Sequence, residues 1–192
     1  MNIDQILHTA LDSNTVSQMS QTLGADQGTT QNAIQAALPM LLGALANNSS
    51  TPDGASALLG ALDRDHDGSV LDDVGGFLGN YAAGNGDGIL GHVFGSRVEV
   101  VQEGISQSSG LDTGRISQLL IMLAPIVMGA LGRANQQGAI NQGNLSDVLT
   151  GATQQVGGNA DTLGMLSQLI DANKDGSAID DVMRMASGLF KK

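Results

Sequence analysis

The sequence predicts an all-α fold made of two tandem helical repeats, each with a helix–Asp-rich loop–helix unit. Apolar residues recur at helical spacing, as at Val16, Met19 and Leu23, and no segment shows the apolar–polar alternation of a half-buried strand. Three sequence patterns also occur twice in the same order, which indicates a duplication. Because only 2% of the 192 residues are aromatic, aliphatic side chains, Met and Ala must fill the core.

The duplication sets the domain organisation. The matching pairs are 20–26 with 106–112, 38–45 with 124–131, and 63–74 with 171–182. The first two pairs are 86 residues apart and the third pair is 108 apart, so the second copy holds about 22 additional residues, in the Gly/Gln/Asn-rich stretch 135–158. We therefore divide the chain into a first repeat, 1–78, a Gly-rich connector, 79–91, and a second repeat, 92–192.

Two long apolar segments occupy matching places in the repeats. Asp26 and Asp112 precede these segments and suit helix N-caps. Pro39 and Pro125 lie inside them, where each removes one backbone hydrogen bond, so we expect a kink or a break at both positions. Further helices are predicted over 3–11 and 94–105.

The composition limits the partners. The formal net charge is −11, with eight Lys and Arg against nineteen Asp and Glu, which disfavours nucleic acid and anionic membrane surfaces and favours metal cations. The chain has no Cys, which excludes disulfides, zinc–thiolate sites and cysteine nucleophiles. The most apolar stretch, 116–131, is interrupted by polar residues and falls short of the roughly 20 residues that span a bilayer, so we expect a buried helix and no membrane span.

The two Asp-rich segments carry the pattern of a calcium site. Calcium takes about six to eight oxygens, and one loop supplies several with side-chain oxygens at positions 1, 3 and 5, Gly at 6 and a carbonyl at 7. The first segment supplies Asp63, Asp65, Asp67, Gly68 and the Ser69 carbonyl; the second supplies Asp171, Asn173, Asp175, Gly176 and the Ser177 carbonyl. We therefore predict two Ca²⁺ sites, the second weaker because Asn173 is neutral.

The end of each segment departs from the EF-hand pattern. Val stands at position 12, where a bidentate Glu normally closes the site, and Asp occupies positions 10 and 11. Two assignments stay open. Either Asp72 and Asp180 cap the next helix, with the spacing of a capping box, and Asp73 and Asp181 close the ion site, or these roles are exchanged.

The chain resembles a bacterial family, domain of unknown function 937. The resemblance rests on residues 86–95, on residues 123–131 and on the two Asp-rich segments, and it covers most of the chain. It implies a soluble helical bacterial protein and implies no particular activity.

The sequence therefore predicts a non-catalytic, calcium-binding protein of structural or interaction type. Phosphate loops, dinucleotide fingerprints, nucleophile elbows and zinc-protease motifs do not occur in it. One alternative is a calcium sensor that exposes a Met-rich groove to a partner. We favour core filling for the methionines concerned, which are Met40, Met122, Met128, Met165, Met183 and Met185. A third, disfavoured alternative is a metal-dependent hydrolase that uses the acidic segments.

The biological partner and the compartment stay open. A protein partner or a second copy of the chain are both compatible with the sequence. Residues 1–11 lack the basic region and apolar run of a signal peptide, which predicts the cytoplasm. Low free calcium there would demand tight sites, which favours export by a route without a recognisable signal peptide.

Overall fold

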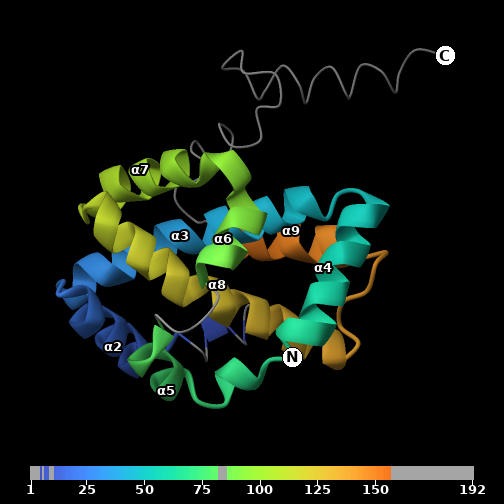
Figure 1. The fold of residues 1–192 in the computed structure, drawn as a ribbon, viewed down its shortest axis with the longest axis horizontal. Helices are drawn as coiled ribbons and strands as arrows, with labels where there is room; N and C mark the ends of the chain where they lie inside the picture. The colour runs from blue at the N-terminus through green and yellow to red at the C-terminus, as the bar shows by residue number, and fades with distance from the viewer. Residues whose placement is uncertain (1–4, 6, 9–10, 82–85, 157–192) are drawn as a thin grey trace, which may run out of the picture.

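The computed structural model describes residues 5, 7–8, 11–81 and 86–156, and this part consists of helices and turns without strands (Figure 1). The helices are α2 (Ser13–Leu23), α3 (Gln27–Asn48), α4 (Pro52–Asp65), η1 (Ser69–Leu71), α5 (Val74–Gly79), α6 (Gly86–Phe94), η3 (Gly95–Arg97), α7 (Val98–Ser109), α8 (Thr113–Gln136) and α9 (Leu145–Val156). The predicted all-α fold is confirmed for the described residues.

Helices α3 and α8 form the centre of the fold. Residues 36–46 of α3 and 122–132 of α8 are buried on every side, as expected of helices that are apolar all round. Helices α7 and α9 pack on α3, while α4, α6 and η1 pack on α8 (Figure 1). Met40, Met122 and Met128 lie in this core, which confirms core filling for these three methionines.

The turns that lead into α3 and α8 have the same geometry. Gly24 and Gly110 adopt left-handed conformations with φ of 59° and 81°, which Gly reaches without the Cβ penalty of other residues. Asp26 and Asp112 then cap the helices by accepting a hydrogen bond from the backbone N–H three residues on. Both predicted N-caps are confirmed.

Neither helix breaks at its proline, in contrast to one of the expected outcomes. Pro39 lies inside α3 and Pro125 inside α8. Pro125 leaves the Ile121 carbonyl without its helical donor, and α6 begins against this oxygen. A Cβ on Gly86 would collide with the Ile121 carbonyl, so only glycine lets α6 approach the gap.

Two predicted segments are divided differently in the structure. The single helix expected over 94–105 is wrong, because α6 ends at Phe94 and α7 begins at Val98 after the turn η3. Gly95 has φ of 57° and interrupts the helix there. Residues 86–91 of the predicted connector already belong to α6, and the additional stretch of the second repeat contains α9.

Helix α8 has the length and the apolar composition of a membrane-spanning helix. In the described part of the chain it is the one helix with these properties, and 72% of its apolar window is buried by other parts of the fold. It therefore serves as a core helix in this structure, as predicted for residues 116–131, while the absence of a membrane span stays a prediction.

Candidate functional site

The first Asp-rich segment, residues 63–74, is here called the acidic turn. Helix α4 continues through Asp63 and Asp65, and the chain then reverses at Gly68, which has φ of 90° and ψ of 0°. Gly68 is thus left-handed at the sixth position, where the predicted loop needs its sharp bend. The 3-10 turn η1 follows, and α5 begins after Asp73.

The carboxylates of the acidic turn have separate protein partners. Asp63 Oδ1 accepts a hydrogen bond of 2.7 Å from Asn135 Nδ2, and Asp67 Oδ1 accepts one of 3.0 Å from the Ser69 backbone N–H. Asp72 Oδ1 lies 2.5 Å from Arg133 Nη2. The described ranges contain no group of three or more His, Cys, Asp or Glu arranged to hold a metal ion.

The predicted ring of oxygens is therefore not assembled in this conformation. Residues two apart on a helix point about 200° away from each other, so Asp63 and Asp65 cannot converge while α4 stays intact around them. The carboxylates do not fit a calcium ion as they stand. Binding would require the last turn of α4 to open.

At the end of the acidic turn, Asp72 and Asp73 have different partners. Asp73 caps α5 by accepting a hydrogen bond of 2.8 Å from the Gly76 backbone N–H. The predicted capping box of Ser69 and Asp72 does not form, because Asp72 turns toward Arg133 instead. Which of the two carboxylates closes an ion site stays a prediction.

The acidic turn rests on a face of α8 formed by Gly129, Gly132 and Arg133, which we call the α8 face. A Cβ on Gly129 would collide with Val70 Cγ1, and one on Gly132 would collide with the His66 carbonyl oxygen. Arg133 Nη2 also donates a hydrogen bond of 2.9 Å to the Gly68 carbonyl. Close backbone contact and one guanidinium thus hold the turn against α8.

Two groups of the turn have shifted pKa values. Hydrogen bonds from Ser69, first from its backbone N–H, lower the pKa of Asp67, and the charge of Arg133 contributes less. Burial lowers the pKa of His66 because it disfavours the charged imidazole, and the nearby Asp65 carboxylate opposes this only in part.

A cavity of about 590 Å³ lies beside the turn, between α3, α4, α6 and α8. Its apolar lining includes Leu45, Leu58, Ile89, Val93 and Met128. Its polar lining consists of Asn48, Arg64, Asp65, His66 and His92. A mainly apolar cavity with a few polar groups is typical of small-molecule sites.

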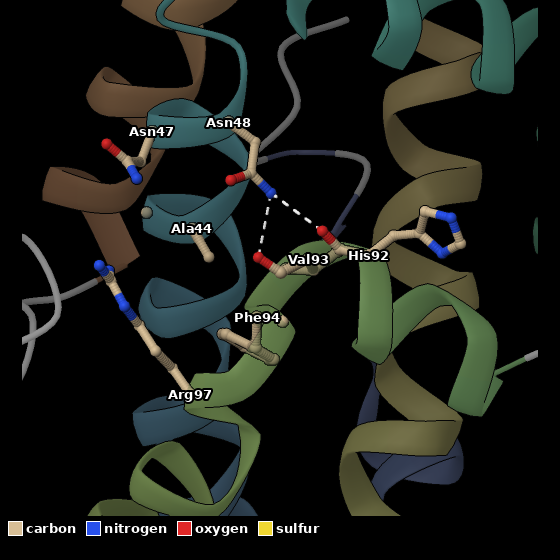
Figure 2. A pocket seen from close by; sticks show the side chains of 9 residues that line it. Ala44, Asn47, Asn48, His92, Val93, Phe94 and Arg97 are labelled. Atoms are coloured by element: carbon tan, nitrogen blue, oxygen red, sulfur yellow. Dashed lines mark hydrogen bonds between the residues drawn. The ribbon is translucent and has the colours of Figure 1, made fainter.

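A second cavity, of about 220 Å³, lies between α3, the end of α6 and η3 (Figure 2). Asn48 lines both cavities and so lies between them. Its Nδ2 donates hydrogen bonds to the carbonyls of His92 (3.2 Å) and Val93 (3.0 Å). These bonds tie the end of α6 to the end of α3. Gly43, Asn47 and Arg97 line this second cavity.

The remaining predicted ligands lie outside the described residues. They are Asp171, Asn173, Asp175, Ser177, Asp180 and Asp181. Sequence reasoning did not find Arg133, Asn135 or the two glycines of the α8 face. The sequence feature that could have revealed this contact is the placement of two glycines and an arginine, at 129, 132 and 133, on one side of an apolar helix. Such a face can accept the backbone and the negative charge of an acidic loop.

A comparison with protein families places the chain. The family model described as "Bacterial protein of unknown function (DUF937)" matches residues 5–134. The chain belongs to this family. The DUF937 match includes both partners of the contact between the acidic turn and the α8 face, whereas α9 and the second Asp-rich segment follow it. No curated protein and no solved structure matches the chain.

Proposed function

We propose that this DUF937 protein is a non-catalytic helical protein of structural or interaction type, made of two tandem repeats, whose acidic segments bind counter-cations and fasten neighbouring helices. In the described conformation the counter-cation of the first segment is Arg133. Calcium is the external cation that we propose for both segments.

The observation that carries the proposal is the charge of the acidic turn. Five carboxylates lie between positions 63 and 73, and all five residues are exposed. Arg133 contacts only one of them, Asp72, at a pair whose side chains are 32% and 72% exposed. An exposed pair of this kind is worth roughly 1 kcal/mol or less, so a divalent ion can displace it.

The two-repeat part of the proposal has its own support. Helices α3 and α8 share three features: a left-handed glycine before the helix, an Asp N-cap and an internal proline. Each feature of α8 lies 86 residues after its match in α3. The buried stretches 36–46 and 122–132 have the same spacing.

Calcium titration of the metal-stripped full chain tests the calcium part. We expect saturable heat for two ions in calorimetry, a higher Tm with calcium, and a weaker response to magnesium. Asp65→Asn should reduce the response of the first site and Asp171→Asn that of the second. Asp53→Asn, on the exposed first turn of α4, is the matched control and should change neither.

The outcome that contradicts the calcium part is a Tm that stays constant between chelator and millimolar calcium, with no binding heat. The acidic turn would then be a contact between protein groups only.

One observation favours the calcium sensor as a second candidate. Met128 and several apolar side chains line the 590 Å³ cavity beneath α4, and the last turn of α4 is the part that must open for calcium. Loading would then expose this cavity to a partner. Binding of a hydrophobic dye that rises with calcium favours the sensor, and dye binding that ignores calcium favours the static protein.

A further inference from the structure

The acidic turn packs on the α8 face, and the matching positions of α3 show whether α3 has a similar face. On α8 the contact uses Gly129, Gly132 and Arg133, with the backbone of His66 and the side chain of Val70 directly against the glycines. If α3 and α8 are repeats, the same register on α3 holds Gly43, Ala46 and Asn47, each 86 residues earlier. We call these three residues the α3 face.

The α3 face borders the 220 Å³ cavity. Gly43 and Asn47 line it on one side, while Phe94, Gly95 and Arg97 line it on the other. Figure 2 shows Arg97 extending along α3 toward Asn47. The cavity thus combines a glycine on α3, Gly43, with a guanidinium, the two kinds of group that meet the acidic turn on α8.

We propose that the second acidic segment of this same chain docks on the α3 face through residues 177–183. With the 108-residue offset, Ala178 and Ile179 stand for Val70 and Leu71, and Asp180 stands for Asp72. Ile179 then fills the cavity beside Gly43, and Arg97 supplies the positive charge for Asp180. This inference rests on the two-repeat part of the proposed function and does not depend on calcium.

A second pair of positions supports the docking independently. In the first repeat Gly75 of α5 lies against Gln18 of α2, where an added Cβ would come within 3.3 Å of the Gln18 amide. The matching residues of the second repeat are Met183 and Gly104. The large and the small residue have exchanged sides, which keeps the volume of the contact, as expected if the two positions meet.

The chain can reach the α3 face. Helix α9 packs along α3, and its last residue, Val156, lines a cavity together with Ile34 and Leu38 of α3. Nine residues of helix separate Ile34 from Gly43, about 14 Å at 1.5 Å per residue. The 20 residues between Val156 and Ser177 span more than this distance in any conformation from helical to extended.

The α3 face differs from the α8 face in one respect that bears on the fit. Ala46 carries a Cβ where Gly132 has none, and its carbonyl oxygen already accepts a hydrogen bond of 3.5 Å from Ser146 Oγ of α9. Contact must therefore centre on Gly43, beside the cavity. The basic residue has also moved, from α8 itself to η3.

Disulfide trapping tests the docking, since the natural chain has no Cys. We expect the pair Asn47→Cys and Asp180→Cys to oxidise within one chain at a rate close to that of Asp63→Cys with Asn135→Cys, whose side chains touch. The matched control is Gln27→Cys with Asp180→Cys, because Gln27 lies on the same helix about 30 Å from Asn47. Equal rates for residues 27 and 47 overturn the proposal, as do cross-links only between chains.

The trapping is run in chelator and again with calcium, so that the two proposals fail separately. A cross-link at 47–180 in chelator supports docking even where calorimetry detects no calcium binding. Calcium binding without this cross-link leaves the proposed function in place and overturns the docking.

The exchanged pair provides a second test that does not rely on cysteines. Gly104→Gln restores the residue of the first repeat and, on a free helix surface, raises Tm because Gly is a poor helix former. Docked against Met183, the same change should lower Tm, and adding Met183→Gly should restore it. A higher Tm for Gly104→Gln alone, with no coupling to Met183→Gly, contradicts the docking.

Discussion

Helices α8 and α3 follow a left-handed Gly, begin at an Asp cap and continue through a Pro, and both are buried over the same stretch of their length. They differ on the side that meets the rest of the chain. Helix α8 presents two glycines and an arginine to the acidic turn, whereas α3 presents one glycine and no charge, and the additional helix α9 packs along it. Two helices with the same caps, proline position and buried stretch can therefore pack against different neighbours when a few residues on one side differ.

The largest effect should come from α9, because in the described part of the chain it makes the most extensive helix contact with α3. Leu149 is fully buried, and Leu149→Ala should cost roughly 2–5 kcal/mol of unfolding free energy through lost burial and a cavity. Val148→Ala, half-buried on the same helix, should cost clearly less. Urea denaturation measures both. A small loss for Leu149→Ala would mean that α9 is an accessory to α3 and that the two central helices are more alike than they appear.

The next effect concerns the close approach at Gly132. Gly132→Ala places a Cβ on the His66 carbonyl and should cost about 1–3 kcal/mol, as overpacking does. Gly91→Ala is the matched control, since a Cβ at this exposed helical position meets nothing within 4 Å and should stabilise by roughly 0.5–1 kcal/mol. If the two variants change stability in the same direction, the α8 face does not depend on its glycines.

Arg133 should contribute less. Arg133→Gln removes the charge beside Asp72 and the hydrogen bond to the Gly68 carbonyl, for a loss of about 1 kcal/mol that shrinks at high salt. Arg115→Gln, on the same helix and paired with Asp112 at 3.5 Å, should cost a few tenths. A double-mutant cycle of Arg133→Gln with Asp72→Asn isolates the pair. Additive losses would show that the two groups do not interact in solution.

The comparison of α8 with α3 also shows what the sequence could predict. Periodicity and caps are local properties, so the central helices, Asp26 and Asp112 followed from the residues themselves. The partners of the acidic turn did not, because Asp63 and Asn135 are 72 residues apart and meet only through the fold. The spacing at 63–67 predicted a loop, yet the helical preference of the preceding Leu- and Ala-rich segment extends α4 through Asp65. The α6–α7 boundary depended on the backbone conformation of Gly95, which spacing alone does not reveal.

The smallest effect is a pH dependence confined to the first docking place. Burial holds the pKa of His66 below its unfolded value near 6.5, so the unfolded chain binds the proton first. The stability from neutral His66 is complete above about pH 6.5 and is lost as pH falls toward the folded pKa. His66→Gln should remove this part of the pH–Tm profile, and His92→Gln, on the other side of the same cavity, should retain it. The residue matching His66 in the second segment is Lys174, so the second segment has no His at this position. Both cross-linking rates fall with the thiolate fraction as pH falls, so the rate of the 47–180 pair is divided by that of the 27–180 control pair. This ratio should be the same at pH 5.5 and 7.5, and a ratio that falls in parallel with the His66-dependent stability would show that the two docking places are coupled through the core.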